Sequence, residues 1–140
     1  MADDAIHEAG HALVAYHTGL KIAYVSLTHC ELSLTCHDDL DSFLAAAMAG
    51  CVAAHIKNGW AKAEPGAGDL AMMAHFWPLL NDNLSGIIRP MHPGRVELAR
   101  DRAETILTAN WPAVESLARS LAFRGYLTGA QVVKILAEVV

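Results

Sequence analysis

Apolar residues recur along most of the chain at the spacing typical of amphipathic or buried α-helices. In the first such segment, about Asp4 to Thr18, Ile6, Leu13 and Val14 together with several alanines form an apolar face. Acidic residues at its start suit the positive end of a helix dipole, and Gly19 is typical of the residue that follows a helix. We therefore predict a helix over this segment.

The pattern changes to the alternation of a β-strand after this helix. β-branched residues are frequent from about Lys21 to Thr28. Two sets of residues alternate along this segment: Ile22, Tyr24, Ser26 and Thr28, and between them Ala23, Val25 and Leu27. The following letters, ELSLTC, predict a second short strand that pairs back on the first, with HCE near the turn. A two-stranded ribbon is only marginally stable alone, so we expect it to lie on the helices.

The rest of the chain predicts five more helices separated by loops rich in Gly and Pro. Their expected positions are about Leu40 to Lys57, a segment starting near Asp69 that Pro78 ends or bends, about Gly94 to Ala109, NWPAVESLARSLAFR before Gly125, and TGAQVVKILAEV, which opens with a capping box of Thr128 and Gln131. The fold class is therefore mainly α, of the α+β type. We expect one compact helical domain over residues 1–140 with a small two-stranded β-ribbon.

Composition and charge narrow the classes of function. The chain is 54% hydrophobic and 18% charged, which is within the range of globular proteins, and its net charge of -5 argues against a nucleic-acid surface. The longest apolar run, FLAAAMAGCVAAHI, is too short for a membrane span, and the N-terminus lacks the pattern of a secretory signal. Three cysteines without framework spacing suit reduced thiols. We expect a cytoplasmic protein that binds neither nucleic acid nor membrane.

The first predicted helix carries the sequence HEAGH, which has the spacing of a catalytic zinc site. Two histidines four residues apart, His7 and His11, project from one helix face and can reach the same ion. Glu8 then points toward the open coordination position, where it can take a proton from water as a general base. Gly10 is a poor helix residue, so we also expect another element to pack closely there.

A catalytic zinc needs a third protein ligand, and the local patterns do not supply one. His17 lies at the distance of the metzincin histidine, but Val14 stands where that pattern requires Gly. A glutamate on a following helix would have to be Glu31 or Glu64, and neither lies in a predicted helix. The residues by themselves therefore leave the third ligand open.

Three segments resemble the peptidase domain of the FtsH-type zinc metalloproteases, which are membrane-anchored AAA+ enzymes. AIHEAGHALVAYHTGL is similar to the family segment AYHEAGHALVA, and LAAAMAGCVAAHIKNGWAKAEPGAGDLAMMA is similar to the segment that ends in the family's NDL group. The tail from Ala99 to Val133 is similar as well. In the family, the Asp of NDL is the third zinc ligand, and the resemblance assigns that role to Asp69.

The resemblance implies a zinc metallopeptidase that cuts unfolded or flexible polypeptides. It also implies a homo-oligomer, because the family assembles as rings, and a substrate strand paired with an edge strand, here Ala23 to Thr28 or Leu32 to Thr35. The chain contains no G-x-x-x-x-G-K-[ST] motif, so an ATPase would have to be a separate partner. Two alternatives stay open: a catalytically inactive zinc-binding regulatory or adaptor module, and a metal-free interaction domain built on the C-terminal helices.

Other residues with metal or catalytic chemistry have ordinary interpretations. The segment HCELSLTCH lacks the spacing of a zinc knuckle, so we interpret Cys30 and Cys36 as strand-end thiols. His55 and His75 lie on apolar helices and are expected in the core or at its boundary. The segment MMAHFW has the spacing of a packed helix face, with the wall of a substrate pocket as the alternative.

Overall fold

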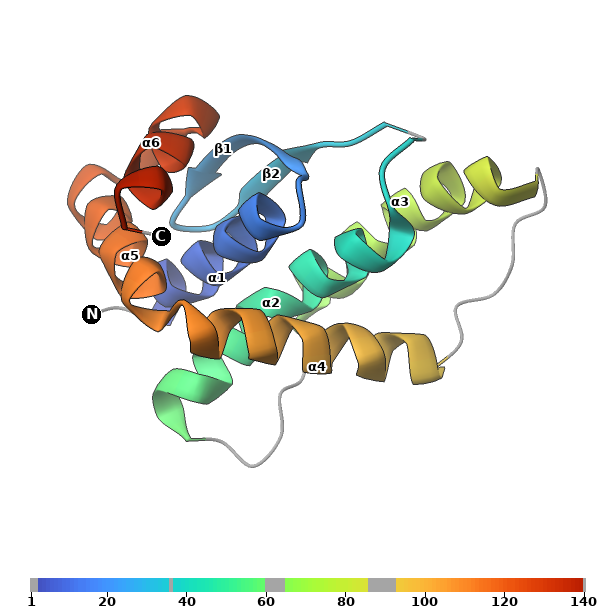
Figure 1. Cartoon of the computed structure of the whole chain (residues 1–140), viewed down its shortest axis with the longest axis horizontal. Helices are drawn as coiled ribbons and strands as arrows, with labels where there is room; N and C mark the ends of the chain where they lie inside the picture. The colour runs from blue at the N-terminus through green and yellow to red at the C-terminus, as the bar shows by residue number, and fades with distance from the viewer. Residues whose placement is uncertain (1–2, 36, 60–64, 86–92, 140) are drawn as a thin grey trace.

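The computed structural model describes residues 3–35, 37–59, 65–85 and 93–139, and it is mainly helical (Figure 1). Helices account for 75% of the structure. The described part contains six of them: α1 (Asp3–His17), α2 (Leu40–Asn58), α3 (Ala67–Ser85), α4 (Pro93–Ala109), α5 (Trp111–Arg124) and α6 (Gly129–Val139). The mainly helical prediction is confirmed.

A small antiparallel sheet lies against the helices, and it has three strands rather than the predicted two. The strands are β1 (Lys21–Ser26), β2 (Cys30–Ser33) and β3 (Tyr126–Thr128), in the order β2-β1-β3. The third strand is formed because Gly125 takes a left-handed conformation, φ 76°, which turns the chain after α5 and places Leu127 opposite Val25. A strand of three residues is too short to show an alternating pattern, which explains why the sequence did not reveal it.

The position of β1 also corrects the predicted edge strand. β1 pairs with β2 on one side and with β3 on the other, so Ala23 to Thr28 has no free edge along Tyr24 to Ser26. A bulge at Ala23 shifts the register between Ile22 and Tyr24, and the two inward side chains of β1 are Ile22 and Val25 rather than alternate residues. Of the two predicted edges, only the β2 segment remains at the margin of the sheet.

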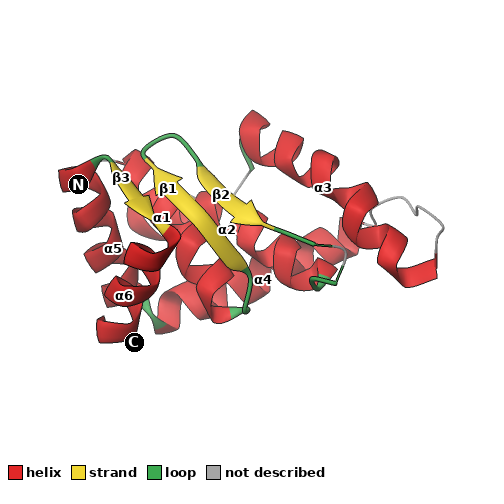
Figure 2. Cartoon of the chain, turned by 90° about the horizontal axis from the view of Figure 1, so that it is seen from above, coloured by secondary structure: helices red, strands yellow, loops and turns green. Residues whose placement is uncertain are grey.

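The first helix lies at the centre of the fold, between α2, α5 and the sheet (Figure 2). Nearly all of its residues from Ala5 to Ala15 are buried. Gly10 permits the close approach of α2, because a Cβ there would lie 2.6 Å from Ala53 Cβ and 2.8 Å from the carbonyl oxygen of Ala49. The expected close packing at Gly10 is therefore confirmed.

The second helix is apolar on all sides because it is enclosed by other elements. It packs against α1, α3 and α4, and its residues from Phe43 to Ala54 are buried. By length and composition alone it is apolar enough to cross a membrane, yet 78% of its most hydropathic window is buried inside the protein. Such burial is typical of the core helix of a globular domain.

Most predicted helix ends agree with the structure. Gly59 and Gly125 follow α2 and α5 in left-handed conformations, and Thr128 and Gln131 form the predicted capping box at the start of α6. The expectation for Pro78 as a helix end is wrong, since α3 continues to Ser85. A proline removes one backbone hydrogen bond, which weakens or bends a helix without necessarily ending it. Part of each predicted loop, residues 60–64 and 86–92, lies outside the described residues.

Candidate metal centre

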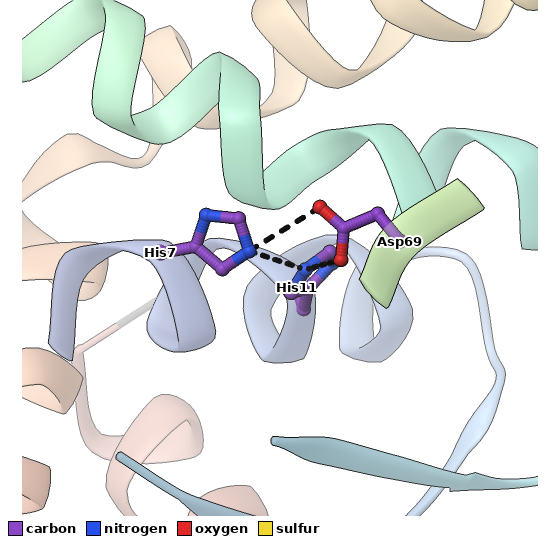
Figure 3. A group of neighbouring side chains, drawn as sticks. All are labelled: His7, His11 and Asp69. Atoms are coloured by element: carbon purple, nitrogen blue, oxygen red, sulfur yellow. Dashed lines mark hydrogen bonds and ion pairs between the residues drawn. The ribbon is translucent and has the colours of Figure 1, made fainter. Parts of the chain in front are cut away.

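Three predicted ligand residues converge at one point between α1 and α3 (Figure 3). His11 Nε2 lies 3.1 Å from His7 Nε2 and 3.1 Å from Asp69 Oδ1. His7 Nε2 lies 3.3 Å from Asp69 Oδ2. Within the described part of the chain, these residues form the one group of three or more His, Cys, Asp or Glu that could hold a metal ion.

Local structure explains why these side chains meet. His7 and His11 are one turn apart on α1, so both imidazoles point to the same side of the helix. Asp69 is in the first turn of α3, where the helix dipole stabilises a carboxylate. The first turn of α3 lies beside α1, although Asp69 is 58 residues from His11 in the sequence.

The spacing and chemistry of the three groups suit a small divalent cation. Ligand atoms bound at about 2.0–2.1 Å to a tetrahedral ion lie about 3.3 Å from one another. The distances of 3.1, 3.1 and 3.3 Å between the groups are close to that value. Two imidazole nitrogens and one carboxylate also leave a fourth position open, which is the donor set of a catalytic rather than a structural site.

A backbone carbonyl from α2 fixes the orientation of His11. The Nδ1 atom of His11 donates to the carbonyl oxygen of Ala46 at 2.7 Å, and His11 itself is only 4% exposed. Because Nδ1 carries the proton in this arrangement, Nε2 of the neutral ring has its lone pair free for a metal ion. This hydrogen bond has the form that commonly orients metal-binding histidines.

The electrostatics of the group favour a positive charge between its members. Burial opposes the charge on Asp69, but hydrogen bonds and charge from His11 and His7 outweigh burial and hold its pKa well below the ordinary value. Burial likewise opposes a charge on His11, and the Asp69 carboxylate outweighs it and raises the pKa of His11. Asp69 Oδ2 is buried, and its partner within the described structure is His7 Nε2, with which it forms an ion pair at 3.3 Å when the imidazole is protonated. The triad therefore attracts either protons or a metal ion.

Glu8 lies beside this group without belonging to it. One of its carboxylate oxygens, Oε1, is 4.0 Å from His7 Nε2, and the residue is 7% exposed. Burial raises its pKa above the ordinary value for glutamate. The buried polar and charged residues of the described core number four, and Glu8, His11 and Asp69 are three of them. Burying charged groups is costly unless they are paired or bind a ligand, which favours a functional role.

Two cavities include Glu8 among their lining residues. One has a volume of about 70 Å³ and is bounded by Glu8, His11, Asp69 and the turn between β1 and β2. The other has a volume of about 480 Å³ and includes His7 and Glu8 among its lining residues. Thr28, in the β1–β2 turn, contributes to both cavities, so this turn lies over the site.

Gly50 is a residue of the site that the sequence did not reveal. A Cβ at this position of α2 would lie 2.4 Å from His11 Nε2 and 2.5 Å from His7 Nε2. Its missing side chain therefore leaves the space in which the two imidazoles meet. A glycine inside a buried, alanine-rich helix costs up to about 1 kcal/mol relative to Ala, and that cost was the signal available in the sequence.

The alternative ligands do not join the triad. His17 is exposed at the end of α1, Glu31 is on β2 and bonded to His29, and Glu64 lies outside the described residues. Cys30 is a buried free thiol that lines the smaller cavity, and Cys36 lies outside the described residues.

The two outlying histidines have different surroundings. His55 lies at the boundary of the core, as expected, and its Nδ1 atom is buried without a hydrogen bond in the described structure. His75 is exposed, contrary to expectation, because Met73 and Phe76, which contacts Phe43 of α2, are the inward residues of this segment. In the MMAHFW segment, Met73 is in the core and Met72 lines the smaller cavity.

Comparison with known proteins adds no relative: no protein-family model matches the chain, and a search of curated proteins finds no match.

Proposed function

We propose that this chain is a zinc-dependent metallopeptidase domain of the FtsH type, acting on unfolded or flexible polypeptides. The observation that carries the proposal is the convergence of His7, His11 and Asp69 beside the buried carboxylate of Glu8. The quoted sequence segments supply the resemblance, and the same four residues stand at the positions that the family uses.

Zinc is the metal that best suits this set of ligands. It prefers four-coordinate tetrahedral sites with imidazole and carboxylate ligands, and catalytic zinc sites keep one position open. The orientation of His11 by the carbonyl group of Ala46 supports metal binding through Nε2. Calcium and magnesium prefer sites made of oxygen ligands only, which this group does not offer.

The reaction would divide its work between the metal and Glu8. When bound, zinc would supply a Lewis acid that activates water and polarises the peptide carbonyl. Glu8 would accept a proton from the attacking water at its carboxylate and then transfer this proton to the leaving amine.

The resemblance also implies a location, a substrate and an assembly for the domain. The domain would act in the cytoplasm, with polypeptide as its substrate. It would assemble as a homo-oligomer, and an ATPase would first have to unfold any folded substrate, because residues 1–140 contain no P-loop motif. The β2 strand would offer the sheet edge for substrate backbone.

A catalytically inactive zinc-binding module is the second candidate. The observation that favours it is the length of the available edge, since β2 has four residues and the neighbouring β1 is paired on both sides. Such a short edge gives a substrate few backbone groups to bind. A module of this kind would bind zinc with the same three residues and would not cut polypeptides.

Cleavage of an unfolded protein separates the two candidates. We expect the zinc-loaded protein to degrade casein and to lose this activity when a chelator removes the metal. Glu8→Gln should retain zinc and lose cleavage, because the amide cannot accept the proton. Cleavage by Glu8→Gln at the wild-type rate would contradict the mechanism, and zinc binding without any cleavage by the wild type would favour the inactive module.

A further inference from the structure

The smaller cavity beside the metal centre has a wall that the proposed mechanism does not use. Its volume is about 70 Å³, and it is bounded on one side by Glu8, His11 and Asp69. A second wall comes from the β1–β2 turn and includes Thr28 and His29, both of which are exposed. A cavity of this size holds only about one or two groups as large as water, so a group bound there would contact both walls.

His29 is held in place by its neighbours in the sheet. Its Nε2 atom donates to the carboxylate of Glu31, and the two residues form an ion pair when the imidazole is protonated. The ring also contacts Tyr24, with ring centroids 6.1 Å apart, and Tyr24 stacks on Tyr126 of β3 at 5.4 Å. The turn thus presents an imidazole whose other nitrogen, Nδ1, makes no hydrogen bond within the described structure.

We propose that His29 is a further catalytic residue: in its protonated form it keeps the Nε2–H on Glu31 and donates a hydrogen bond from Nδ1 to the substrate carbonyl oxygen as that oxygen becomes negatively charged. The inference rests on the proposed peptidase function and extends it to the β1–β2 turn. Glu31 would act as a positioning residue, because it holds Nε2 and leaves Nδ1 for the substrate.

The chemistry of the cavity supports this assignment. Attack on a peptide carbonyl moves negative charge onto its oxygen, and a donor that is already in position stabilises that charge. Glu8 and Asp69 are carboxylates and can only accept when ionised, and Nδ1 of His11 already donates to Ala46. Among the titratable side chains that line this cavity, His29 is therefore the one with a ring N–H left to donate when its imidazole is protonated.

A charged transition-state analogue tests the role without depending on turnover. The probe is a tripeptide whose scissile amide is replaced by a phosphinate, which is tetrahedral and anionic, and its affinity for the zinc-loaded protein is measured by calorimetry. We expect His29→Ala to weaken binding about 10- to 100-fold, the usual effect of a hydrogen bond to a charged group. His29→Gln, whose amide NH₂ can still donate, should recover part of the loss.

Two controls separate catalysis from structure. His17→Ala removes an exposed histidine at the end of α1 and should leave phosphinate affinity unchanged. Zinc content and the affinity for the uncharged peptide of the same sequence should change less than about threefold in His29→Ala, because the contact forms only with the charged oxygen.

Each outcome decides the question. Selective loss of phosphinate affinity in His29→Ala supports the role, and it does so even if the wild type cuts no polypeptide, in which case only the peptidase proposal fails. Equal phosphinate affinity in wild type and His29→Ala overturns the role, as does an equal loss for both ligands or no phosphinate binding by the wild type. Where cleavage is measurable, kcat should fall about 10- to 100-fold in His29→Ala with little change in KM.

Discussion

The proposed metal centre predicts that Gly50→Ala binds zinc far more weakly than the wild type while remaining folded. The added Cβ would lie 2.4 Å from His11 Nε2 and 2.5 Å from His7 Nε2. Atoms in van der Waals contact are about 3.5 Å apart, so each imidazole has to move by about 1 Å. Metal–ligand distances tolerate deviations of only about 0.2 Å, and the two nitrogens can then no longer bind one ion together with Asp69.

The effect on stability should be much smaller than the effect on metal binding. Ala in place of Gly inside a helix gains up to about 1 kcal/mol, whereas an extra methyl group in a packed region costs about 1–3 kcal/mol. His7 absorbs part of the crowding because its side chain is 28% exposed and can turn outward. We therefore expect a net change in the free energy of unfolding below about 2 kcal/mol and a loss of zinc affinity of at least about 100-fold.

The assay compares zinc affinity and urea unfolding of the metal-free protein for wild type, Gly50→Ala and Gly10→Ala. Gly10→Ala is the matched control, because its Cβ would crowd Ala53 and Ala49 at the same pair of helices rather than the imidazoles. It should lower stability more than Gly50→Ala does and affect zinc affinity less. If Gly50→Ala binds zinc within about threefold of wild type, the inferred geometry of the site is wrong.

Three further predictions concern other parts of the structure. Burial raises the pKa of Cys51 to about 11, so little of this thiol is ionised at pH 8. Alkylation of Cys51 in the native protein, followed by mass spectrometry, should be slow at pH 8 and accelerate as the pH rises toward 11. Fast alkylation at pH 8 would contradict the burial of this thiol. Thr128→Ala should destabilise the protein by about 0.5–2 kcal/mol in urea unfolding, because its hydroxyl accepts from the backbone N–H of Gln131, and an unchanged midpoint would show that the cap contributes nothing. Glu31→Gln should weaken phosphinate binding less than His29→Ala does, since the amide can still accept from Nε2, and a larger effect would place Glu31 itself in contact with the ligand.

The sequence predicted the elements whose signals are local. The cap residues Gly59 and Gly125 and the capping box at Thr128 depend only on residues near each helix end, and the structure agrees with them. The pairing of His7 with His11 also follows from the geometry of one helix.

Features that depend on tertiary contacts were not visible in the same way. Asp69 reaches the histidines across 58 residues, and only the family resemblance pointed to it. β3 forms because the chain after α5 returns to β1 and pairs with it. The bulge at Ala23 shifts the register, so that Ile22 and Val25 both face the core. Gly50 is part of the site only because α2 packs against α1 at this point. The spacing of hydrophobic residues along the sequence does not predict that contact.

The most direct test of the metal centre is the zinc content of purified protein beside that of Asp69→Ala. The account predicts about one zinc per wild-type chain after reconstitution and much weaker retention in the variant, because removal of the carboxylate leaves two imidazoles to hold the ion. An absence of zinc from the reconstituted wild type, or equal retention by Asp69→Ala, would contradict the three-ligand site, and absence would favour a metal-free interaction domain.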